Sequence, residues 1–283
     1  AQRVDRKNKR GLKILRAELA RLANKLAIPG IMRARVLDPW LRVYLFALRL
    51  EEQHAAFTKL VGKRFAKGVA KRTHVVLLQE LKHLERFTAQ LLERQSKVSV
   101  RTRTSDEQQI FAVSASEGIF YKDRHLAGGV AFSAAHCLFD GFKANFYELP
   151  IWFREGLAHW FAQEVDPHEV NRTQGTNGED VTMLQNKDWN DLSLPLIKSK
   201  AMTPLAEIFE SKNYAQLRFR DHIACWSRVD FMIRVHPDGF ASFLDGIKGQ
   251  YRSTGGSLQG EEVIECVRKS FRESFGGDPE GFD

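Results

Sequence analysis

Three residues in the middle of the chain, His136, Glu155 and His159, carry groups that proteins use to hold a catalytic metal. Glu155 and His159 are four positions apart, so on a helix their side chains share one face. With His136 they offer two imidazoles and one carboxylate, a set that suits zinc or iron. The alternative is structural: His136 and Glu155 form a buried hydrogen-bonded pair, and His159 is a helix-surface or supporting residue.

The most informative motif runs from Pro150 to Phe161, with the sequence Pro-Ile-Trp-Phe-Arg-Glu-Gly-Leu-Ala-His-Trp-Phe. It resembles the P-x-W-x-x-E-G-x-A-x-x-F stretch of gluzincin metallopeptidases, most closely the peptidase-MA-like family. In that family the Glu of this stretch, which corresponds to Glu155, is the third zinc ligand. His136 precedes Glu155 by 18 intervening residues, the interval of the gluzincin pattern H-E-x-x-H-x18-E. The resemblance therefore implies that His136 and Glu155 occupy two ligand positions.

Softer motifs extend the resemblance over roughly residues 97–283. Gly118 to Tyr121 is similar to the family's edge strand, and Ala224 to Phe231 is similar to the helix after its active site. The segment from Phe275 to Asp278 is similar to its closing stretch. The resemblance implies a substrate cleft beside which Tyr121 and Trp152 lie.

The metal motif itself departs from the family. In a working site its first and fifth residues are His that bind zinc, and its second is a Glu that acts as general base. Here these positions hold Phe132, His136 and Ser133. An aromatic ring cannot replace the imidazole ligand, and a hydroxyl has no useful basicity at neutral pH. We therefore expect a metallopeptidase-like protein without proteolytic activity, with no catalytic residue and no bound cofactor.

The alternative function is an active metalloenzyme, a metal-dependent hydrolase with a rebuilt site. In it, His159 or the more distant His125 supplies the missing ligand, and a zinc ion alone activates water. Two other candidates are weaker. His168 and Glu169 begin like the metal motif but lie in an expected loop after Pro167. Cys137 adjoins His136 on a helix, where neighbouring side chains diverge, so we expect a buried, inert thiol.

Several predicted helices precede these residues. One is marked by leucines at steps of three and four, ends at Pro29-Gly30, and comprises Leu12, Leu15, Leu19, Leu22 and Leu26. Another runs from Trp40 to about Phe65. A third passes through Leu77, Leu81, Leu84 and Leu91, with Thr88 at the remaining apolar position. We expect residues 1–95 to form a basic helical arm or bundle that folds separately.

After Ser96 the pattern changes to short strands around residues 98–102, 110–113 and 119–121. Helical spacing then returns, and it predicts helices from Leu126 and over residues 151–165, 219–235 and 261–275, with another around residues 240–247. The predicted fold class is α+β. Residues 96–283 are expected to form a gluzincin-like domain with a small sheet, two active-site helices and a helical C-terminal part.

The charge is unevenly distributed. Residues 1–100 hold 23 Lys and Arg against 8 Asp and Glu, whereas the remaining residues hold 20 against 27. This asymmetry favours an anionic partner of the basic arm or attraction between the two halves. For the former substrate cleft we expect a polypeptide or protein partner. No apolar run approaches the roughly 20 residues that cross a bilayer, so no transmembrane segment is expected. The Ala-Gln start favours a secreted or periplasmic location.

Overall fold

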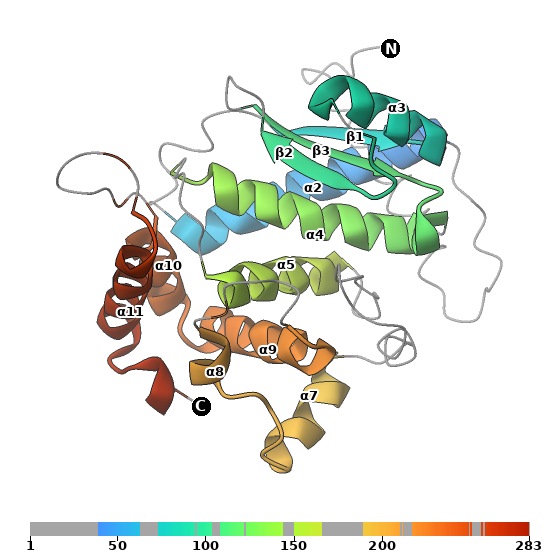
Figure 1. The fold of residues 1–283 in the computed structure, drawn as a ribbon. Helices are drawn as coiled ribbons and strands as arrows, with labels where there is room; N and C mark the ends of the chain where they lie inside the picture. Colours follow the sequence, from blue (N-terminus) through green and yellow to red (C-terminus); the bar gives the residue numbers. More distant parts are fainter. Residues whose placement is uncertain are drawn as a thin grey trace, which may run out of the picture.

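The computed structural model describes residues 39–62, 73–93, 95–103, 108–121, 123–143, 150–165, 189–209, 217–248 and 258–282, together with residues 211, 250 and 256. Within these ranges the fold is mixed α+β and mostly helical, with a small three-stranded sheet (Figure 1). The predicted fold class is confirmed at this level. None of the helices in these ranges is both long and apolar enough to cross a membrane.

The sheet has the strand order β1-β3-β2. Its strands are β1 (His74–Leu78), β2 (Val100–Arg103) and β3 (Gln109–Ser114). β1 runs parallel to β3, and β2 runs antiparallel to it. Every residue of β3 is buried, as is typical of a central strand that is covered on both faces. The strands predicted around residues 98–102 and 110–113 are confirmed.

Helices lie on both faces of this sheet (Figure 1). On one face α3 (Leu81–Leu92) contacts β1 and β3, and on the other α4 (Asp123–Gly141) contacts β3. α2 (Pro39–Val61) packs along α4. The amide of Gln53 on α2 donates to the carbonyl oxygen of Ala131 on α4 at 2.8 Å, and Arg42 forms a buried ion pair with Asp123. These contacts tie α2 to the rest of the described fold.

Three stacked helices carry the candidate site. α5 (Ile151–Val165) lies between α4 and α9 (Phe219–Val235) and packs against both (Figure 1). The predicted bounds of α5 and α9 are confirmed at both ends. α5 begins after Pro150, whose carbonyl oxygen accepts hydrogen bonds from the amides of Phe153 and Arg154, both at 3.1 Å.

The C-terminal part is helical, as predicted. It contains α7 (Trp189–Lys198), α8 (Leu205–Phe209), α10 (Pro237–Gly246) and α11 (Glu261–Phe275). α10 and α11 pack together, and α7 and α8 pack against α9. An aromatic core joins them to α5: the Trp152 ring stacks on those of Phe209 and Phe243, with centroids 5.6 Å and 6.1 Å away.

The helix predicted through Leu77 was placed too early. Residues His74–Leu78 form β1, and the helix starts only at Leu81. The apolar run of β1 contains two β-branched residues, and Val75 pairs with Phe111 in the neighbouring strand. This long-range pairing overrides the helical spacing of the leucines. The remaining helical turns are as expected, because Thr88 is fully buried on α3.

The strand predicted around Tyr121 was also wrong. Gly118–Tyr121 form a short 3-10 helix, η2. Gly118 has a φ of 50°, in the left-handed region that glycine favours, so the chain turns away from β3. The amide of Phe120 then donates to the carbonyl oxygen of Glu117 at 2.8 Å instead of to a neighbouring strand.

The predicted domain boundary between residues 95 and 96 runs through the sheet. β1 precedes this boundary, and its partner β3 follows it. Any cut at residue 95 therefore separates two hydrogen-bonded strands, and it also separates α2 from α4. The predicted helix through Leu12 and the segment with His168 and Glu169 lie outside the described residues.

Candidate functional site

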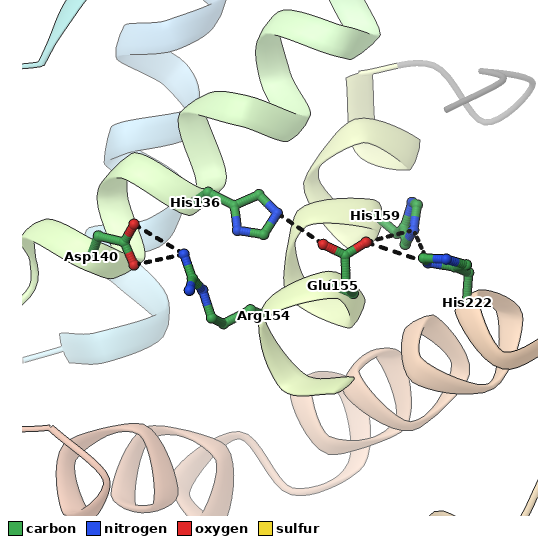
Figure 2. A network of polar contacts seen from close by, with 6 residues as sticks. All are labelled: His136, Asp140, Arg154, Glu155, His159 and His222. Atoms are coloured by element: carbon green, nitrogen blue, oxygen red, sulfur yellow. Dashed lines mark hydrogen bonds and ion pairs between the residues drawn. The ribbon is translucent and has the colours of Figure 1, made fainter. Parts of the chain in front are cut away.

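α4 and α5 bring His136 and Glu155 together. Nε2 of His136 lies 3.3 Å from Oε1 of Glu155, and both residues are buried (Figure 2). Arg154, which precedes Glu155 on α5, donates through Nη2 at 3.0 Å to the carboxylate of Asp140, one turn after His136 on α4. The His136 contact falls outside hydrogen-bond geometry, so neither of its ring nitrogens has a hydrogen-bond partner. The two helices are thus held together around an incompletely satisfied imidazole.

The zinc position that the gluzincin resemblance implies does not fit the residues present. Its first ligand position holds Phe132, whose ring centre lies 5.0 Å from the ring centres of both His136 and His159. Its general-base position holds Ser133, which is buried. Only His136 and Glu155 remain there as metal ligands, and two ligands are too few for a protein zinc site.

His159 is not a surface residue. Its side chain is fully buried, and Nε2 lies 3.7 Å from Oε2 of Glu155. Its ring packs against Trp189 of α7, with the ring centres 4.7 Å apart. The sequence placed His159 on the same helix face as Glu155, and the structure brings the two side chains together there.

The fourth member of the cluster is His222, which the sequence analysis missed. It lies in the first turns of α9, and its Nδ1 is 3.3 Å from Oε2 of Glu155 and 3.1 Å from Nε2 of His159 (Figure 2). The sequence nevertheless contains a pattern that points to His222. His222, Cys225, Val229 and Met232 recur at helical spacing and all face the core. A histidine on that apolar face was therefore a candidate for a buried polar contact.

A close approach of two helices places His222 beside Glu155. Gly156 follows Glu155 on α5, and a Cβ atom built there would lie 2.4 Å from the carbonyl oxygen of Cys225 on α9. Any larger residue would push the helices apart. Glycine at this position of the motif is therefore what allows the first turns of α9 to reach the Glu155 carboxylate.

Glu155, His159 and His222 together form a buried group whose ligand atoms all lie within 4.8 Å of one another, so it could hold a metal ion. Its protonation state suits one. Burial lowers the pKa of His136 to about 4 and that of His159 to about 3. Burial alone would raise the pKa of Glu155, but contacts with His136 and His222 hold it well below its usual range. At neutral pH the carboxylate is therefore ionised and the His159 imidazole is neutral, as a metal ligand must be; the neutral His136 lies outside this group of three.

The other predicted site residues lie elsewhere. Trp152 is fully buried in the aromatic core, and Tyr121 is exposed at the end of η2, so the structure does not bring them together at a cleft. His125 lies on the first turn of α4 and is not part of the metal-binding group. The Cys137 thiol is buried, which raises its pKa to about 12 and makes it inert at neutral pH.

Two neighbouring pockets open where α2 meets α5, and they share Ala56 and Trp160. The larger has a volume of about 470 Å³ and also contacts α9 and α10 through Ile233 and Ala241. The smaller has a volume of about 260 Å³. The Trp160 indole is fixed between them, because its Nε1 donates to Asp230 at 3.0 Å.

Comparison of the chain with protein-family models, curated proteins and solved structures finds no match. Membership of the gluzincin family therefore stays a prediction that rests on the motif around Glu155.

Proposed function

We propose that this chain is a metallopeptidase-like protein that does not cleave peptide bonds and instead binds a polypeptide partner. The observation that carries the first half of this proposal is the packing of Phe132. Its ring contacts both His136 and His159, at 5.0 Å between ring centres, in the place where a first zinc ligand is needed. The family's metal position is thereby converted into an apolar contact.

The residues present also leave no side chain to serve as the general base. Ser133 stands at the general-base position, and its hydroxyl has no useful basicity at neutral pH. Glu155 cannot take over that role, because Oε1 faces His136 and Oε2 faces His159 and His222. These contacts support a site that is structural rather than hydrolytic.

The paired pockets beside Trp160 support the second half of the proposal. Both are lined by Ala56 and Trp160, and the lining also carries both signs of charge, with Lys59 and Asp238 in one and Arg49 and Glu164 in the other. A lining that combines apolar and charged side chains fits an extended polypeptide that inserts an apolar side chain. The fixed indole gives such a side chain a rigid wall to pack on.

Selection from a random peptide library tests the proposal. The matched control is Ala56→Trp, which adds a large side chain at a position that lines both pockets. Peptides should be enriched on the native protein and depleted on the control, with affinity at least tenfold lower for Ala56→Trp. Mass spectrometry should recover the bound peptides intact after prolonged incubation, with or without added zinc.

Two results would count against the proposal. Chelator-sensitive cleavage of the selected peptides, or of casein, that disappears in Glu155→Ala would show a working peptidase. Equal enrichment on the native protein and on Ala56→Trp would remove the pockets as the binding surface.

A further inference from the structure

The possible ligand atoms of Glu155, His159 and His222 are spaced like the corners of one face of a tetrahedron. The separations are 3.1 Å between His159 and His222, 3.3 Å between His222 and Glu155, and 3.7 Å between His159 and Glu155. In a tetrahedral zinc site with bonds of about 2.0–2.2 Å to nitrogen and oxygen, ligand atoms are about 3.3–3.6 Å apart. The observed spacings scatter around that value.

A network of hydrogen bonds alone accounts for this geometry less well. The contact between His159 and His222 is a hydrogen bond at 3.1 Å. The contacts of the Glu155 carboxylate with the same two rings are longer, at 3.3 Å and 3.7 Å. Charge-assisted hydrogen bonds from nitrogen to a carboxylate oxygen are about 2.7–2.9 Å long. A buried carboxylate held this far from its partners is better explained by an ion between them.

We infer that Glu155, His159 and His222 form a binding site for a divalent cation, with zinc as the best-fitting ion. Two imidazoles and one carboxylate match the ligand preference of zinc. This site lies at the contact between α5 and α9, whereas the metal position that the gluzincin resemblance implies lies at the contact between α4 and α5. The inference does not depend on the proposed function, because these three residues can hold an ion whether or not a polypeptide is bound elsewhere on the protein.

His136 has a different role in this arrangement. Its Nε2 faces Oε1 of Glu155 at 3.3 Å, whereas the two other rings face Oε2. It is therefore a positioning residue, whose contact with one carboxylate oxygen directs the other toward the cation. Outer partners of this kind typically change metal affinity by about 10- to 100-fold without changing the number of ions bound.

Zinc binding to the full chain, purified without chelator, tests the inference. Bound metal is measured by mass spectrometry, and affinity is measured by competition with a coloured chelator. The native protein should bind one zinc per chain. His159→Gln and His222→Gln should each lose binding by more than about 100-fold. His136→Gln should still bind one zinc, with affinity lowered by about 10- to 100-fold. The matched control, His83→Gln, changes an exposed histidine on α3 and should bind like the native protein.

Ligand identity is read from cobalt-loaded protein. His222→Cys should give a thiolate-to-cobalt absorption band that the native protein lacks. If the variants at 159 and 222 do not fold, His136→Gln decides, because X-ray absorption should still report two imidazoles around the metal. The inference is overturned if the native protein binds no stoichiometric zinc, if His222→Gln binds it as tightly as the native protein, or if His136→Gln loses an imidazole from the metal.

Discussion

Nε2 of His159 lies 3.1 Å from Nδ1 of His222, although the two residues are 63 positions apart in the sequence. The pair is packed on two sides. The His159 ring contacts Trp189 and Phe132, with ring centres 4.7 Å and 5.0 Å away. His222 is buried as well, so both histidines belong to the core and to the candidate metal site.

His159→Ala should consequently destabilise the protein even without metal. It leaves a cavity beside Trp189 and removes the hydrogen-bond partner of His222, so we expect a loss of about 2–4 kcal/mol in the free energy of unfolding. Urea unfolding in the presence of a chelator measures it. The exposed control His83→Ala should change stability by less than about 0.5 kcal/mol. Equal effects of the two substitutions would show that His159 is not a core residue.

Gly156→Ala should disturb the approach of α9 to α5. The added Cβ would meet the Cys225 carbonyl oxygen at 2.4 Å, and a main-chain atom cannot move aside as a flexible side chain can. We expect a loss of about 1–3 kcal/mol in stability, since one extra methyl group overpacks the contact. The control is Gly277→Ala, where an added Cβ meets nothing within 4 Å. A stability loss no larger than that of Gly277→Ala would contradict the proposed packing.

The metal-free protein should be sensitive to mild acid. Burial lowers the pKa of His136 to about 4 and that of His159 to about 3, below the unfolded value of about 6.5. Between these values the unfolded chain takes up protons that the folded protein excludes, so stability falls as pH decreases. Each imidazole should contribute about 1.4 kcal/mol per pH unit in that window.

Urea unfolding at pH 7.5, 6.0 and 5.0 with chelator checks this dependence. His136→Asn should reduce the slope, because one of the buried titrating rings is gone. A slope that is the same in both proteins would rule out His136 as a contributor.

Restoring the family's motif provides a test of the resemblance. Phe132→His with Ser133→Glu, made in the His222→Gln background, should recover zinc binding through a ligand set that includes His136 and Glu155. Zinc binding should return before hydrolysis does, since the substrate cleft must also fit a peptide. His222→Gln alone and His222→Gln with Ser133→Glu are the controls. No recovery of zinc in the combined variant, once it is shown to be folded, would argue against the gluzincin-like geometry of α4 and α5.

The sequence was most informative where local spacing and packing agree. α5 and α9 have the predicted bounds, because each has apolar residues at helical spacing and α5 begins directly after Pro150. The short apolar run Val75–Leu78 was ambiguous. Leu77 continues the helical spacing of the later leucines, yet the two valines favour a strand. Only the pairing with β3 decides between the two structures.

For a similar reason, only half of the candidate site could be predicted from the sequence. Glu155 and His159 share a helix face, so their spacing predicts proximity. The contact with His222 depends on how closely α9 approaches α5, which is set by Gly156 and by the packing of Cys225 and Val229. Spacing along the chain carries no direct information about such a contact between distant helices. From the sequence we expected His136 and Glu155 to form a pair without a metal, because two ligands are too few to hold one. With His222, Glu155 belongs instead to a group of three possible ligands.

The most direct measurement is a crystal structure of the zinc-loaded protein, with anomalous diffraction recorded on both sides of the zinc absorption edge. We predict one strong anomalous peak within about 2.0–2.2 Å of His159 Nε2, His222 Nδ1 and Glu155 Oε2, with His136 contacting Oε1 outside the coordination sphere. A peak bonded to His136 in place of His222, or no peak at the cluster in crystals that bind zinc elsewhere, would contradict it.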